Sequence, residues 1–236
     1  MSRAGFTLSE GEVHVWQAGL DAGCQLPALS ATLAEDERVR AGRFHAPKDR
    51  DHFIAARGLL RAILARYLGT SPAALRFTYG PRGKPMLAAD SNPGDLRFNL
   101  AHSRGLALYA VIRGREVGVD VEHIAARGEA GIADRFFSPR EAATLRSLPA
   151  ALRRDAFYVC WTRKEAYIKA RGDGLALDLS QFDVSIAPGE PAALLRHEGE
   201  PNASRWSLTA LDVAPGYAAA LCVEGPHSPP ICRTWS

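Results

Sequence analysis

The segment 117–122 constrains the fold more than any other part of the chain. Three valines alternate in it with Gly118, Asp120 and Glu122. Because successive side chains of a β-strand point to opposite faces, the pattern predicts a strand with a buried valine face and a second face that carries two carboxylates. Two acids on one face repel each other, and a divalent cation would remove the repulsion. A solvated strand face is the alternative interpretation.

A second charged run lies at residues 161–169 and reads Trp-Thr-Arg-Lys-Glu-Ala-Tyr-Ile-Lys. It is helical in character, and Glu165 and Lys169 stand one turn apart on one face, a pairing that is also common on solvated helices. Together with Asp120 and Glu122, Glu165 completes a set of three carboxylates. Oxygen ligands without nearby His or Cys favour Mg²⁺ or Mn²⁺ over zinc, so the residues predict a hard-cation and phosphate site.

Taken together, these two runs resemble the 4'-phosphopantetheinyl transferase superfamily, in its surfactin-synthetase-activating (Sfp) type. That family carries G-[IV]-D-[IV]-E, here 118–122, and W-x-x-K-E-[AS]-x-x-K, here 161–169. Similar segments are G-K-P at 83–85, F-N-[IL]-S-H-[ST] at 98–103 and R-F-F-[ST]-x-x-E at 135–141, so that the resemblance covers residues 36 to 186. Two positions depart from it: Ala101 replaces a serine, and Glu37 stands where some relatives have lysine.

The resemblance implies an α+β fold of two similar α+β subdomains, related by a pseudo-two-fold axis, with the ligand cleft between them. We place the subdomains at residues 1–114 and 115–236. It also implies Mg²⁺-dependent transfer of the 4'-phosphopantetheine arm of coenzyme A to a serine of an apo acyl or peptidyl carrier protein, giving 3',5'-ADP. Asp120, Glu122 and Glu165 would bind the metal.

Further site residues follow from the same resemblance. Coenzyme A would be bound by Arg57, Lys84, His102, Asp120, Lys164 and Lys169, and the catalytic residues would be Glu165, Lys169 and Glu141. The attacking serine needs a base, for which a cation-polarised water or Glu165 is the first choice and Glu141 the second. His102 as a turn histidine and Arg57 as a solvated helix arginine are the alternative interpretations.

The bulk composition fits a globular protein with anionic ligands or an acidic partner. A hydrophobic fraction of 47% and a charged fraction of 23% predict an ordered core, and the net charge of +3 suits an acidic protein partner without requiring nucleic acid. The sequence contains neither a membrane-spanning apolar run nor a secretory signal, and its four cysteines are scattered. We therefore expect a cytoplasmic monomer without membrane contact, disulfide framework or zinc site.

Two rival functions are considered. Another Mg²⁺-dependent phosphate hydrolase, acting on a nucleotide-containing substrate, would use the same carboxylates with water as the attacking group. A basic nucleic-acid-binding module would need a helix-turn-helix, a zinc finger or an aromatic platform, and none is recognisable. The chain also carries no G-x-S-x-G elbow and no phosphate loop.

Periodicity and end signals predict the remaining elements. Helices are expected over 27–43, 49–68 and within 132–170, with Ser138 and Glu141 forming a capping box and Gly69 and Gly172 following helix ends. Strands are expected at 12–20, 75–79, 96–100, 106–112, 182–186, 206–211 and 217–223.

Overall fold

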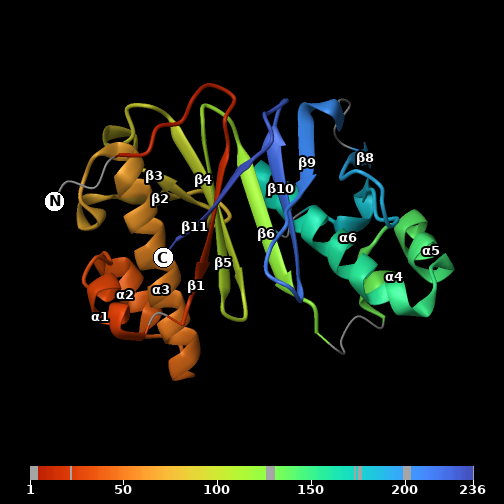
Figure 1. The fold of residues 1–236 in the computed structure, drawn as a ribbon, viewed down its shortest axis with the longest axis horizontal. Helices are drawn as coiled ribbons and strands as arrows, with labels where there is room; N and C mark the ends of the chain where they lie inside the picture. Colours follow the sequence, from red (N-terminus) through yellow and green to blue (C-terminus); the bar gives the residue numbers. More distant parts are fainter. Residues whose placement is uncertain are drawn as a thin grey trace.

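Two long helices enclose a double layer of β-sheet. The computed structural model describes residues 5–21, 23–125, 131–172, 174, 177–198 and 203–235. Helix α3 (Pro47–Leu68) and helix α6 (Ala150–Arg171), each of 22 residues, lie on opposite sides of the strands (Figure 1). Each helix covers one sheet, and the two sheets face each other.

The two halves repeat one topology. In the first half, β1 (His14–Gly19), β5 (Leu106–Arg113) and β4 (Leu96–Ser103) are hydrogen-bonded in that order, and β2 (Phe77–Tyr79) with β3 (Pro85–Leu87) forms a separate hairpin. In the second half, β6 (Val117–His123), β10 (Tyr217–Glu224) and β9 (Trp206–Ala210) pair in the same order, and β7 (Phe182–Val184) with β8 (Leu194–His197) forms the matching hairpin. The predicted α+β fold of two similar subdomains is confirmed.

Three apolar clusters hold these layers together. One lies between α3 and the first sheet and another between α6 and the second sheet. The third joins the two sheets, and it contains Val117, Val119 and Val121 of β6, all at most 1% exposed. The predicted valine face of this strand is therefore buried between the two halves. Its opposite face is directed at α6, because Gly118 lies against the backbone of that helix.

One long predicted helix, 27–43, is interrupted. The stretch 27–43 forms two helices, α1 (Leu26–Ser30) and α2 (Glu35–Ala41), because the Glu37 carboxylate accepts the Ala34 backbone N–H and starts a new helix there. The stretch 132–170 contains α4 (Ile132–Phe136) and α5 (Pro139–Ser147) before α6. Ser138 and Glu141 form the predicted capping box at the start of α5. The predicted helix ends at Gly69 and Gly172 are confirmed, and both glycines are left-handed.

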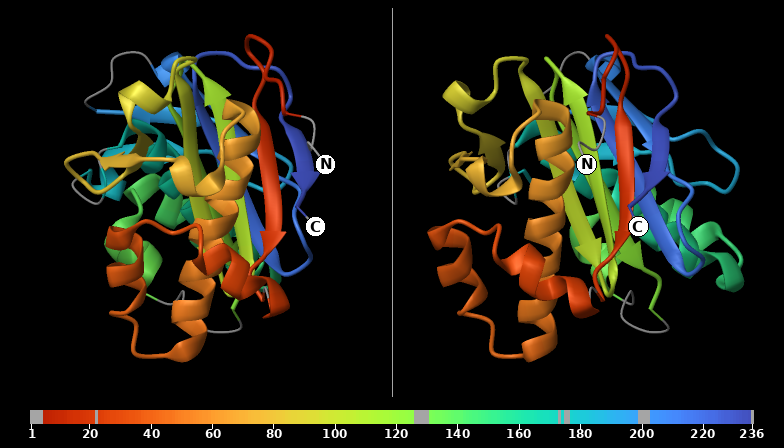
Figure 2. Two further views of the ribbon diagram at one scale, coloured as in Figure 1. Left: turned by 90° about the vertical axis from the view of Figure 1, so that its left-hand side faces the viewer. Right: turned by 60° about the vertical axis from the view of Figure 1, so that its left-hand side comes forward.

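The last strand joins the sheet of the first half. β11 (Ile231–Thr234) pairs in parallel with β1, so it extends the first sheet although its residues were assigned to the second half (Figure 2). Open hydrogen-bonding groups at the edge of β1 provide the reason, since an uncovered edge accepts another strand. None of the described helices is both long enough and apolar enough to cross a lipid bilayer.

The contact between β6 and α6 predicts a severe effect for Gly118→Ala. A Cβ at residue 118 would overlap the Ala166 carbonyl oxygen and the Ala170 backbone nitrogen, neither of which can move away as a side chain could. We expect a loss of about 3 kcal/mol in the free energy of unfolding, measured by urea denaturation. Gly19→Ala is the control, because nothing lies within 4 Å of a Cβ there. Equal stability of the two variants would contradict the assigned packing.

Candidate active site

An ion pair joins the acidic face of β6 to α6. The Lys169 ammonium lies 2.6 Å from Oδ1 of Asp120, whose side chain is only 4% exposed. Gly118, two residues before Asp120 on the same face of β6, permits this approach. Without a side chain there, the strand backbone can lie directly against the helix backbone at Ala166 and Ala170. The acidic face of β6 and the Glu165–Lys169 face of α6, both predicted from residue spacing, therefore meet at this ion pair.

Glu122 and Glu165 belong to the same electrostatic cluster as Asp120. Burial raises the pKa of Asp120, and burial followed by repulsion from Asp120 raises the pKa of both Glu122 and Glu165. The positive charge of Lys169 opposes each of these shifts. Three carboxylates with one lysine leave excess negative charge in a poorly hydrated place, which favours the arrival of a cation.

The first half supplies two polar side chains to this cluster. Ser103 at the end of β4 donates its hydroxyl to Oε2 of Glu122 at 2.8 Å and accepts the backbone N–H of His123 at 3.1 Å. Asn99, also on β4, accepts the backbone N–H of Val119 at 2.9 Å. These bonds fix β4 beside β6, so that the cluster lies where the two halves meet.

The donors suit a hard cation, although they do not yet surround one. Oδ2 of Asp120 is buried and has no hydrogen-bond partner among the described residues. Carboxylate oxygens are the ligands that Mg²⁺ prefers. In the described part of the chain, however, no three His, Cys, Asp or Glu side chains converge as ligands of one ion. The ligand set Asp120, Glu122 and Glu165 therefore stays a prediction. In this structure the positive charge beside Asp120 is that of Lys169.

A mostly apolar cavity opens beside Glu165 and Lys169. Its volume is about 230 Å³, and it is lined from the first half by residues 82–85 with Asn99 and Leu100 and from the second half by α6 and the glycines that follow it. A cavity between the two halves is what the resemblance implied for the ligand.

A second cavity lies at the other end of β4. It measures about 450 Å³, and its lining includes Lys48, His52, His102 and Arg104. Burial of part of the ring, followed by the positive charges of Lys169 and His52, lowers the pKa of His102 and favours its neutral form near neutral pH. Lys48 and Arg104 outnumber the one carboxylate of the lining, Asp49, so this cavity suits an anionic group.

Glu141 and Lys164 lie elsewhere, which corrects their assignment to catalysis and coenzyme binding. They form an ion pair of 2.8 Å with side chains 2% and 0% exposed. Lys164 also donates to the carbonyls of Leu179 and Phe182, and Oε1 of Glu141 accepts the N–H of Val184. The pair joins α5, α6 and β7 inside the second half, so neither group has a free position facing a ligand.

Arg57 is likewise buried, although its position on α3 predicted an exposed side chain. Its Nε donates to Oε1 of Glu37 at 2.6 Å, and Arg61 donates to the other oxygen of that carboxylate at 2.6 Å. Glu37 is 2% exposed. Glu37, which stands where some relatives have lysine, thus supplies the negative charge that the buried Arg57 and Arg61 need. Because Arg57 is engaged in this way, it is not available to a coenzyme phosphate.

Lys84 is placed at the site but with its charge engaged. It lines the cavity beside Glu165, as predicted for a ligand-binding residue, yet its ammonium contacts Glu116 at 2.8 Å and two backbone carbonyls. The other predicted residues, Asp120, His102 and Lys169, all face the cluster or one of the two cavities.

Comparisons with known proteins agree with this arrangement. Two family models match, one described as 4'-phosphopantetheinyl transferase, N-terminal, over residues 20–114 and one as the 4'-phosphopantetheinyl transferase superfamily over residues 116–222. The chain is 43% identical to the 4'-phosphopantetheinyl transferase HetI of Nostoc sp., over 93% of this chain and 90% of that protein. It is 30% identical to a 4'-phosphopantetheinyl transferase of Bacillus subtilis, over 84% of this chain and 85% of that protein.

The chain belongs to the 4'-phosphopantetheinyl transferase superfamily. It is a transferase with the Sfp-type relatives that its motifs indicated, including the Sfp protein of Bacillus subtilis at 27% identity over 84% of each chain. The resemblance predicted from the two motifs is confirmed.

Sequence reasoning missed three contributors to the site. Asn99 was quoted only as part of a motif, Ser103 entered only as a possible replacement for the phosphate-contacting serine missing at Ala101, and Glu116 was not considered. A signal was present for the first two, since alternation along β4 places residues 99, 101 and 103 on one face of the strand. For Glu116 there was none, because its partner Lys84 lies 32 residues away in the chain.

Glu165→Gln should stabilise the metal-free protein at alkaline pH. The folded-state pKa of Glu165 is raised above 4.5, so the native state binds more protons than the unfolded chain above that pH and loses stability as pH rises. The variant lacks this loss. We expect its melting temperature in a chelator to exceed that of the wild type by a few degrees at pH 8, and the gain to vanish at pH 4.

A suitable control is Glu35→Gln, which removes a carboxylate that is 78% exposed and therefore well hydrated. It should show no comparable pH-dependent gain. If Glu165→Gln instead lowers the melting temperature equally at pH 4 and pH 8, the Glu165 carboxylate is not destabilised by burial and by the neighbouring carboxylates, and the prediction is wrong.

Proposed function

We propose that the protein transfers the 4'-phosphopantetheine arm of coenzyme A to a serine hydroxyl of an apo acyl or peptidyl carrier protein, in a Mg²⁺-dependent reaction that releases 3',5'-ADP. The observation that carries the proposal is the cluster of Asp120, Glu122, Glu165 and Lys169 at the junction of the two halves. Membership of the family supports the reaction class.

The charges at the site fit displacement at a pyrophosphate. The serine Oγ attacks the phosphorus that carries the pantetheine arm, the bond from this phosphorus to the bridging oxygen breaks, and the nucleotide half leaves with the bond's electrons. Negative charge grows on the leaving phosphate, and the Lys169 ammonium, held beside Asp120, provides fixed positive charge against it. Asp120, Glu122 and Glu165 would hold the Mg²⁺, which supplies neutralisation of the pyrophosphate when bound.

The proton of the serine hydroxyl needs an acceptor. Of the two carboxylates considered from the sequence, Glu141 is buried in an ion pair, whereas Glu165 lines the cavity. Glu165 is therefore the protein group that we propose as the acceptor of this proton.

The two cavities on either side of the cluster would receive the ends of the coenzyme. In the cavity of about 450 Å³, Lys48 and Arg104 offer positive charge for a phosphate group, beside the one carboxylate of Asp49. The cavity of about 230 Å³ beside Glu165 combines charged groups, Arg82, Lys84 and Lys169, with apolar ones, and it would take the part of the ligand next to the pyrophosphate. The net charge of +3 agrees with an acidic carrier as partner. A cytoplasmic location, a monomeric state and the lack of nucleic-acid and membrane contacts stay predictions.

Intact-mass analysis of an apo-carrier incubated with the protein, coenzyme A and Mg²⁺ tests the proposal. We expect a gain of one phosphopantetheine group that disappears with a chelator. Asp120→Asn should lower the rate at least about 100-fold, because it removes a charge from the predicted ligand set without changing the volume of the side chain. Its circular dichroism should match the wild type.

Asp90→Asn serves as the matched control, since Asp90 is 61% exposed and contacts only the exposed Arg76 and the neighbouring Ser91 hydroxyl among the described residues. It should modify carriers at the wild-type rate. Normal carrier modification by Asp120→Asn would remove the proposed site. Family membership argues against the hydrolase alternative, which would require release of 3',5'-ADP from coenzyme A with no carrier present.

A further inference from the structure

The ammonium of Lys84 is fully engaged by three acceptors. It donates to Oε2 of Glu116 at 2.8 Å, to the carbonyl of Ala170 at 3.0 Å and to the carbonyl of Val117 at 3.3 Å. A lysine ammonium has three N–H donors, so none is left over for a ligand. The side chain is 16% exposed, and its contacts are accordingly little screened by water.

These acceptors all belong to the other half of the molecule. Lys84 lies in the turn between β2 and β3, in the first half, whereas Val117 begins β6 and Ala170 lies in the last turn of α6. The final carbonyls of a helix lack partners within the helix, and a cation at this end is favoured by the helix dipole. Lys84 therefore caps α6 from a hairpin of the opposite subdomain.

The backbone beyond α6 is shaped to receive this hairpin. Gly172 and Gly174 have φ angles of +77° and +58°, which favour glycine. A Cβ at Gly172 would lie 3.7 Å from Cδ of Lys84, and one at Gly174 would lie 3.1 Å from Cβ of Arg82. The turn of the hairpin is itself closed by the bond from the Gly80 N–H to the Lys84 carbonyl, at 2.9 Å. The contact between the hairpin and the end of α6 thus depends on backbone conformation as well as on the ion pair of Lys84 with Glu116.

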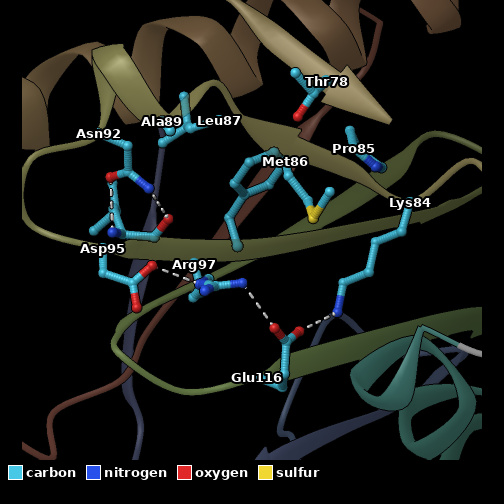
Figure 3. A pocket seen from close by; sticks show the side chains of 12 residues that line it. Thr78, Lys84, Pro85, Met86, Leu87, Ala89, Asn92, Asp95, Arg97 and Glu116 are labelled. Atoms are coloured by element: carbon cyan, nitrogen blue, oxygen red, sulfur yellow. Dashed lines mark hydrogen bonds and ion pairs between the residues drawn. The ribbon is translucent and has the colours of Figure 1, made fainter. Parts of the chain in front are cut away.

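Lys84 also forms a wall between two cavities. One is the cavity of about 230 Å³ beside Glu165 and Lys169. The other, of about 410 Å³, lies on the far side of the hairpin, where Glu116 receives Arg97 at 2.9 Å as well as Lys84 (Figure 3). Loss of the Lys84 contacts would free the hairpin from α6 and open the wall of the first cavity.

We propose that Lys84 is a positioning residue. It ties the 80–84 turn to the end of α6 and so sets the width of the cavity beside Glu165, with Glu116 as its charged partner. This inference rests on the proposed function, because it concerns how the same site accepts coenzyme A. It replaces the direct charge contact with coenzyme A that the sequence suggested for Lys84.

The variants Lys84→Met and Glu116→Gln separate the two roles. If Lys84 positions the hairpin, Lys84→Met removes all three contacts and weakens coenzyme A binding in calorimetry by about tenfold. Glu116→Gln removes the charge of one contact and leaves the two carbonyl contacts, so it weakens binding in the same direction by less. Both variants raise KM and leave kcat within about twofold, and the double variant is no weaker than Lys84→Met alone. If Lys84 instead contacts the ligand's phosphates, Glu116→Gln frees the ammonium and leaves coenzyme A binding unchanged or tighter, which would overturn the proposal.

Amide hydrogen exchange provides a readout that does not need the proposed function. Both variants should speed exchange in the 80–84 turn and in the last turn of α6 together, whereas Arg76→Met, which breaks an exposed ion pair of the first half, should not. Faster exchange without a change in coenzyme A binding would refute the positioning role. Failure of the wild type itself to bind coenzyme A would refute the proposed function. The exchange result would still test whether the Lys84 contacts hold the hairpin against α6.

Discussion

The site depends on the close packing of one strand, β6, against one helix, α6. Gly118 lets the strand backbone lie on the helix backbone at Ala166 and Ala170, and this approach carries Asp120 to within 2.6 Å of Lys169. The opposite face of the strand consists of valines buried between the two sheets. Because one face is held by apolar packing and the other by backbone contact, the acidic side chains have little freedom to move apart.

That arrangement works against stability in the absence of a ligand. Burial and mutual repulsion raise the pKa values of Asp120, Glu122 and Glu165, and Lys169 compensates only in part. Such strain is common at functional sites, where the surrounding fold holds groups that would separate in water. Here the surroundings include the first half as well, since its Asn99 and Ser103 side chains bond to β6 in the second half.

The two halves are tied together at several places besides the cluster. β11 returns to the first sheet and carries the end of the described chain back across the molecule. The hairpin turn at Lys84 reaches in the other direction and contacts the end of α6. A ligand between the halves therefore meets surfaces whose separation is set by contacts on both sides.

Much of the fold and part of the site could be predicted from local patterns. The helix over 49–68, the capping box at Ser138, the buried valine face of β6 and the meeting of Asp120 with α6 all follow from periodicity or from motifs. Short strands escaped prediction: β3, β8 and β11 have three or four residues each, too few to show alternation. β11 in addition exists only because the edge of β1 is open to it.

The sequence by itself determined which residues share a face of a strand or helix, and through its motifs the family. Only the tertiary structure decided which carboxylate each of the basic side chains pairs with. Arg57, Lys84 and Lys164 all looked available to phosphate, yet each is paired with a carboxylate 20 to 32 residues away. The physical reason is that periodicity fixes the direction of a side chain relative to its own element, whereas burial and pairing depend on the element packed against it.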